Sequence, residues 1–219
     1  MNIRTVANTV TDDENPYKEG ETAMSSLTIS ELLIRRAKYD EEYWERRGTI
    51  SERITHIAFC VGEATGKFAT VLKEDAHGFA TDHSVLSREV APDILGCALQ
   101  LFNFASRSYA PEEYTLGEIQ KAMVVPHNVE TLTYILLKRL FPCGLTFRTL
   151  LGEWQDGNGA AFQRDVNNLA DFLLMTAIAI ANELKVDLEE LYLRRTVEIV
   201  GKIADYRSTD GGASFTGKP

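Results

Sequence analysis

The sequence predicts an all-α protein, a helical bundle of about six main helices. Apolar residues recur every three or four positions over long segments, and Thr-x-x-Glu capping boxes precede several of these segments. The stretches between them are short and rich in Gly, Pro or Asn. A length of 219 residues can bury a sizeable core. We expect one domain over residues 27–207, between mobile polar tails at 1–26 and 208–219.

Two capping boxes predict where the first two helices begin. They are Thr28-Ile-Ser-Glu31 and Thr49-Ile-Ser-Glu52. The first helix should end at Arg47, because Gly48 can adopt the left-handed terminating conformation. So short a junction predicts that the first helix lies antiparallel beside the second, which runs over 51–73.

Three acidic residues lie within otherwise apolar helical patterns. Glu63 is near the middle of the second helix, whereas Glu89 and Asp93 share one side of the next, over 84–106. Carboxylates one turn apart repel each other, and either solvent or a divalent cation such as Mg²⁺ relieves the repulsion. They therefore predict either an acidic cleft or solvated acids on amphipathic helices. Pro92 predicts a kink beside them.

The rest of the chain continues the helical pattern. We expect a short helix between Pro111 and Pro126, helices over 128–141 and 145–154, a turn at 155–160, and helices over 161–184 and from 187 to about 206. The helix over 161–184 is the most apolar, and we expect it in the core of the bundle together with the helices that carry Glu63 and Asp93. Residues 90–99 are similar to residues 169–178, which favours an internally duplicated helix pair.

Charge and cysteine usage limit the classes of partner. A net charge of −9 and a pI near 5.0 argue against a nucleic-acid or anionic-membrane surface. Cys60, Cys97 and Cys143 are widely spaced and form no CxxC pair, so they are interpreted as buried thiols of a reducing compartment. No segment has the length and hydropathy of a signal peptide or membrane span, which favours a cytoplasmic location.

Residues 55–67 and 88–95 resemble the two acidic helices of the MazG-like all-α NTP pyrophosphatases. Residues 169–191 are similar to the family's following helix pair, although each motif alone has low specificity. The resemblance implies a Mg²⁺-dependent enzyme, with Mn²⁺ as a substitute, that hydrolyses an NTP or dNTP to the monophosphate and pyrophosphate.

The resemblance also implies roles for particular residues. Glu63, Glu89 and Asp93 would be the catalytic magnesium ligands. Asp171 is the one additional metal candidate from the second half. Lys67, Arg195 and Lys202 would contact the substrate phosphates. Family relatives build such sites beside subunit contacts, and the helices here are apolar over wide arcs, so a homodimer or homotetramer is expected.

The sequence departs from the family pattern in ways that leave the function open. Where the family has the second Glu of its first motif, this chain has Gly66 or Lys67. Glu89 and Asp93 are four residues apart rather than three, with Pro92 as a candidate insertion. Lys67 can pair with Glu63 one turn away or contact a phosphate directly.

These departures leave three hypotheses. The first is an NTP pyrophosphohydrolase. The second is a catalytically decayed relative that binds nucleotides or pairs subunits. The third is a helical scaffold without a ligand.

Overall fold

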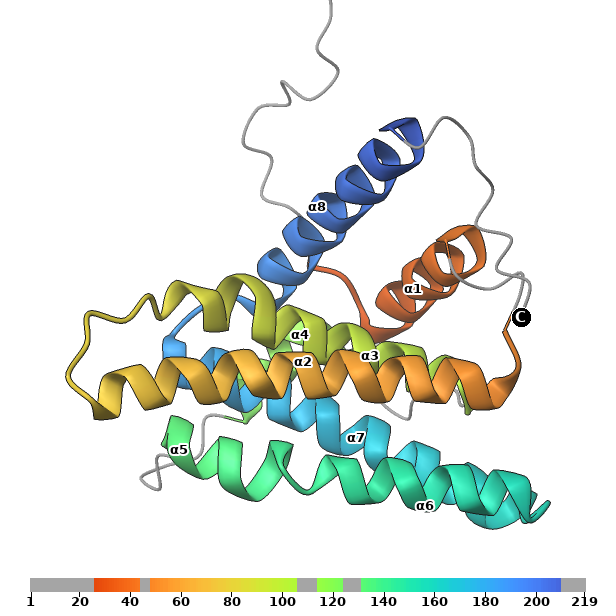
Figure 1. Ribbon diagram of the computed structural model, residues 1–219. Helices are drawn as coiled ribbons and strands as arrows, with labels where there is room; N and C mark the ends of the chain where they lie inside the picture. Colours follow the sequence, from red (N-terminus) through yellow and green to blue (C-terminus); the bar gives the residue numbers. More distant parts are fainter. Residues whose placement is uncertain (1–25, 44–47, 106–113, 124–130, 210–219) are drawn as a thin grey trace, which may run out of the picture.

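The computed structural model describes residues 26–43, 48–105, 114–123 and 131–209, and the protein is an all-α helical bundle (Figure 1). Its helices are α1 (Ile29–Tyr43), α2 (Ile50–Ala76), α3 (Ala91–Phe104), α4 (Leu116–Ala122), α5 (Leu132–Ile135), α6 (Cys143–Gln155), α7 (Gly159–Leu184) and α8 (Leu188–Thr209), with π-helical turns at Leu86–Val90 and Leu136–Leu140. In these ranges six α-helices have 13 residues or more, which confirms the predicted bundle. None of the helices in the described part combines the length and hydropathy of a membrane span.

Local side-chain chemistry sets the helix starts. The boxes at Thr28, Thr49 and Thr115 all form: each hydroxyl accepts a bond from the backbone N–H three residues later, and the Glu there accepts a bond from the Thr backbone. The predicted end of the first helix at Arg47 lies outside the described residues. The predicted tails also lie outside the described residues, except at their edges. Ser26 donates a hydrogen bond to Glu189 at 3.0 Å, and α8 continues to Thr209.

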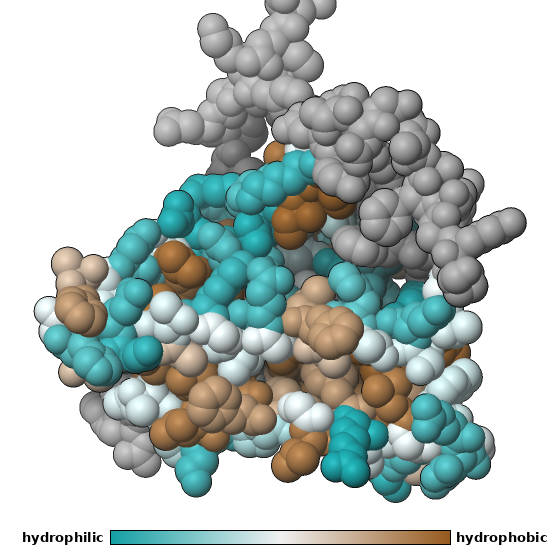
Figure 2. Space-filling view, in the orientation of Figure 1, coloured by the Kyte–Doolittle hydropathy of each residue, from teal (hydrophilic) through white to brown (hydrophobic). Residues whose placement is uncertain are grey.

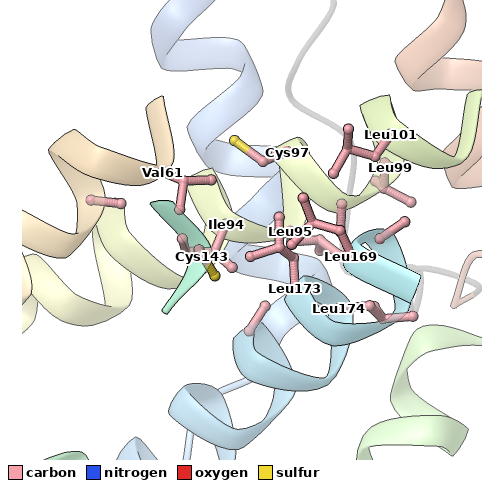
Figure 3. Close-up of a cluster of buried hydrophobic side chains, with 14 of the residues drawn as sticks. Val61, Ile94, Leu95, Cys97, Leu99, Leu101, Cys143, Leu169, Leu173 and Leu174 are labelled. Atoms are coloured by element: carbon pink, nitrogen blue, oxygen red, sulfur yellow. The ribbon is translucent and has the colours of Figure 1, made fainter. Parts of the chain in front are cut away.

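Helix α3 is the centre of the bundle. Every residue from Ala91 to Phe102 except Asp93 is buried, and α1, α2, α7 and α8 all pack against it. Helix α7 forms the largest of these contacts, along a row that includes Leu95 and Leu169 (Figure 3). The two segments that suggested a duplication, 90–99 and 169–178, therefore face each other in the core. A helix that is apolar all round belongs inside a bundle, which explains why α3 and α7 share the core position predicted for both.

Helix α1 does not lie along α2 as an antiparallel neighbour, so that prediction was wrong. It packs chiefly against α3, and it lies with α8 on the other side of the α2–α3 layer from α6 (Figure 1). Ile29, Leu32 and Leu33 are buried at this contact end of α1. A short connection keeps two helices near each other but does not determine which faces meet. The packing of α1 is determined by the burial of its apolar face against α3.

The kink predicted at Pro92 is accommodated by a π-helical turn over Leu86–Val90, immediately before α3. The backbone N–H of Ala91 donates to the carbonyl of Leu86, five residues back. Proline has no N–H to donate and its ring crowds the preceding turn, so a widened turn removes the conflict. The extra residue in this turn lies within the acidic segment, where Glu89 and Asp93 are four apart.

Gly96 on α3 faces the side chain of Arg36 from α1. A Cβ at this position would lie 3.0 Å from Nη1 of Arg36, which is held by Asp40 and Gln100. Gly66 on α2 has open space instead. The two glycines therefore form a matched pair, because alanine is favoured over glycine in both helices by about 1 kcal/mol before packing is considered.

Gly66→Ala is expected to raise the free energy of unfolding by about 1 kcal/mol, from helix propensity alone. Gly96→Ala is expected to lower it by about 1 kcal/mol, because the displaced Arg36 would weaken its buried pair with Asp40. Urea denaturation of both variants checks this. Equal stabilisation by the two substitutions would show that Arg36 is not fixed against α3.

Candidate functional site

The residues singled out by the sequence meet where α2, α3 and α8 converge. Glu63 and Lys67 are one turn apart on α2, and Glu89 lies on the π-helical turn before α3. Lys67 Nζ is 2.8 Å from Oε1 of Glu63 and 2.8 Å from Oε2 of Glu89. One ammonium group thus joins the two helices. The predicted i,i+4 pair of Lys67 with Glu63 forms, and a long-range pair with Glu89 accompanies it.

Arg195 on α8 binds the third predicted acid. Its Nε and Nη2 donate to the two carboxylate oxygens of Asp93, at 2.9 and 3.0 Å. The same Nη2 lies 3.9 Å from Oε2 of Glu89, and Nη1 donates to Glu198 at 3.1 Å. A planar fork onto a carboxylate is the strongest pairing geometry available to arginine. Lys67 and Arg195 therefore link the three acids in one network.

Two further candidates lie apart from this centre. Lys202 is exposed and pairs with Glu198 at 2.6 Å, one turn farther along α8. Asp171 is half-buried on α7 and does not line the cavity that adjoins the network. The structure thus brings together five of the predicted residues, Glu63, Lys67, Glu89, Asp93 and Arg195, with Lys202 attached through Glu198.

The network shifts the pKa values of its members in different directions. Burial raises the pKa of Asp93 above its ordinary value, although Arg195 opposes this shift. The hydrogen bond from Lys67 lowers the pKa of Glu89. Burial disfavours the charge on Lys67, but its bonds to Glu63 and Glu89 outweigh burial and raise its pKa. At neutral pH the lysine and the arginine are charged, and they compensate the carboxylates.

A cavity of about 200 Å³ adjoins Asp93 and Arg195. Its walls come from α1, α2, α3 and α8, and they include two arginines, two tyrosine rings, a histidine and two thiols. The residues are Arg36, Tyr39, His56, Cys60, Glu63, Pro92, Asp93, Gly96, Cys97, Gln100, Tyr192, Arg195, Thr196 and Ile199. The cavity therefore combines charged, aromatic and sulfur-containing groups in a small space.

Sequence reasoning missed the α1 side of this cavity. Arg36 Nε is 2.9 Å from Asp40 Oδ1, and Asp40 is only 1% exposed. Arg36 Nη2 also donates to the buried side chain of Gln100, at 3.2 Å. The i,i+4 spacing of Arg36 and Asp40 was visible in the sequence, but such pairs are common on solvated helices. Only the packing of α1 on α3 shows that this one is buried.

The clustered candidate ligands Glu63, Glu89 and Asp93 do not fit a magnesium ion in this arrangement. Lys67 Nζ lies between Glu63 and Glu89, and the Arg195 guanidinium covers both oxygens of Asp93. Within the described ranges, no group of three or more His, Cys, Asp or Glu side chains is placed to hold a metal ion. Magnesium requires several oxygen ligands at short range, whereas these oxygens already face protein cations.

Comparisons with known protein families, with curated proteins and with solved structures give no match for this chain. The resemblance to the MazG-like family therefore depends only on the sequence of residues 55–67, 88–95 and 169–191. The assignment of a function depends on the geometry of the network and cavity.

Arg195→Leu is expected to lower the free energy of unfolding at pH 7 by about 2 kcal/mol, because Asp93 would stay half-buried without its partner. The pKa of Asp93, already raised, would rise further. The folded state of the variant then favours the neutral carboxyl. The loss of unfolding free energy is therefore greatest at pH values above the pKa of Asp93 in the folded state, and it disappears below the ordinary pKa of 3.8.

Urea denaturation at pH 7 and near the ordinary pKa of Asp93 measures this difference. The loss in the variant should shrink as the pH falls. Lys202→Ala, which removes an exposed pair, should change stability by less than about 0.5 kcal/mol at either pH. An Arg195→Leu penalty that is independent of pH would contradict the assigned role of the fork.

Proposed function

We propose that this protein binds a nucleoside triphosphate, with the phosphates on Lys67 and Arg195. The observation that carries the proposal is that these two cations, one from α2 and one from α8, both approach Oε2 of Glu89. Arg195 also lines a cavity whose walls include two tyrosines. Arginine presents a planar fork that matches phosphate oxygens as well as carboxylate oxygens. An incoming phosphate can therefore take the place of Glu89 beside both cations, while Asp93 keeps its fork to Arg195.

The cavity can hold the base or sugar of such a ligand. Tyr39 and Tyr192 contribute rings to its walls, and Gln100 contributes an amide whose oxygen accepts from Arg36. Its two lining arginines are matched by two lining acids, Glu63 and Asp93, so the interior carries no large net charge. A volume of about 200 Å³ is below the usual range for a whole drug-sized ligand, so it suits a base or sugar with the phosphates at the rim.

The geometry favours binding over hydrolysis. The carboxylates that a metal-dependent pyrophosphohydrolase would use are paired with Lys67 and Arg195. This supports the second hypothesis, a nucleotide-binding relative whose acidic site has decayed. One observation favours the enzyme instead: Glu63, Glu89 and Asp93 are gathered in one place, and the side chain of Glu63 is 68% exposed, so it can change partners. Activity measurements separate the two.

Isothermal titration calorimetry with a non-hydrolysable triphosphate is expected to show binding with or without Mg²⁺. Lys67→Glu should weaken it about tenfold or more, because it replaces attraction to phosphate by repulsion. Lys67→Gln should have a smaller effect, since it removes the charge without reversing it. Lys202→Ala is the control, because among the described residues Lys202 pairs with Glu198 and with none of Glu63, Glu89 and Asp93.

A panel of NTPs and dNTPs with Mg²⁺ or Mn²⁺, assayed for pyrophosphate release, completes the test. Binding without release supports the proposal, whereas release that Lys67→Glu increases would establish the pyrophosphohydrolase. No binding to wild type, or binding that Lys67→Glu leaves unchanged, would mean that this rim is not a nucleotide site.

A second proposal concerns self-association, because large apolar side chains are exposed on one region of the bundle. Phe59 on α2 and Leu145 on α6 are each 71% exposed, and these two helices pack against each other. Phe141 lies immediately before α6 and is 53% exposed. Figure 2 shows apolar surface over α2 and the helices next to it. We propose that a second copy of the chain covers this surface, in a homodimer or homotetramer.

Light scattering is expected to give the mass of a dimer or tetramer for the wild-type chain. Phe59→Arg should shift the protein toward the monomer by placing a charge in the apolar contact. Phe79→Arg is the matched control, because Phe79 is 67% exposed but lies in the turn after α2. A wild-type monomer, or equal effects of the two substitutions, would refute the proposed interface.

A further inference from the structure

Two thiols from neighbouring helices face the same cavity. Cys60 on α2 is half-buried and Cys97 on α3 is 5% exposed, and both line the cavity wall. They are close enough for their side chains to share a hydrogen bond. Figure 3 places Cys97 on the side of α3 away from Leu95 and Leu169, so its sulfur does not belong to the apolar row between α3 and α7. Both cysteines are free.

The surroundings of the two thiols differ. His56, one turn before Cys60 on α2, has Nε2 at 3.5 Å from its sulfur. The hydrogen bond from Cys97 lowers the pKa of Cys60, and His56 and the charge of Arg36 lower it further, against the effect of burial. The same hydrogen bond and complete burial raise the pKa of Cys97. Of the two thiols, Cys60 is therefore the one that ionises more readily.

Cys143 gives the contrast within the same chain. It is buried beside Ile94 and Leu173 in the apolar cluster of Figure 3, and it does not line the cavity. Its thiol donates to the backbone carbonyl of Arg139 at 3.2 Å. Burial raises its pKa to about 11, which leaves almost no thiolate at neutral pH.

We propose that Cys60 is an oxidation site that reacts with hydroperoxides, and that Cys97 resolves the product into a disulfide between α2 and α3. The Cys60 thiolate attacks one oxygen of the peroxide, the O–O bond breaks, and the leaving alkoxide or hydroxide takes a proton to give alcohol or water. The resulting sulfenic acid condenses with the Cys97 thiol, forming the S–S bond and releasing water. The peroxide gains the two electrons that the two thiols lose.

The partners in the cavity suit these two steps. A histidinium beside a sulfur stabilises its thiolate, and the hydrogen bond to Cys60 raises the pKa of His56 so that it can hold this charge. Half-burial of Cys60 leaves it accessible to a small oxidant, whereas Cys97 is sheltered until Cys60 has reacted. The inference does not depend on nucleotide binding, since no step uses Lys67 or Arg195.

Mass spectrometry of the whole chain after treatment with hydrogen peroxide tests the proposal. The expected product has a disulfide between the Cys60 and Cys97 peptides, with Cys143 still reduced. In Cys97→Ser, dimedone should trap a sulfenic acid on Cys60. In Cys60→Ser, oxidation of Cys97 at the same peroxide dose should be lost.

A comparison of cysteine reactivities within the wild-type protein does not depend on whether the cysteine variants fold. Limiting iodoacetamide at neutral pH should alkylate Cys60 at least about tenfold faster than Cys143, and His56→Gln should reduce this preference. Equal alkylation of Cys60 and Cys143 would overturn the proposal. So would oxidation of Cys60 without a disulfide to Cys97.

Discussion

The pairing of Arg195 with Asp93 is the interaction on which the rest of the site depends. It joins α8 to α3 by a fork of two short hydrogen bonds, and both residues line the cavity. Through Glu89 and Lys67 it also ties α8 to α2. A half-buried carboxylate is tolerated only when a cation meets it, so the positions of three helices and the charge state of the site are fixed together.

The features predicted from sequence were those with local causes. The capping boxes at Thr28 and Thr49 need only residues three apart, and the conflict at Pro92 needs only its own turn. The i,i+4 pair of Lys67 with Glu63 could be predicted for the same reason. Its bond to Glu89 depends on the packing of α2 on the segment before α3, which spacing alone does not determine.

What sequence reasoning missed was decided by burial. The direction of α1 depends on which of its faces finds apolar surface, and α3 offers more of it than α2. Arg36, which is paired with the buried Asp40, therefore lines the cavity. Cys60 was interpreted as a buried thiol, yet it is half-buried beside His56. No periodicity in the chain distinguishes a thiol at a cavity wall from one in the core.

Manganese binding, followed by the electron paramagnetic resonance signal of the free ion, tests the central claim most directly, namely that the protein's own cations compensate its three clustered acids. With equimolar wild-type protein, the signal of free Mn²⁺ should not fall. In Lys67→Gln, which frees Glu63 and Glu89, some of the signal should be lost as the ion binds. Stoichiometric binding of Mn²⁺ to the wild-type protein would contradict the account, because it would show that the carboxylates are available to metal despite Lys67 and Arg195.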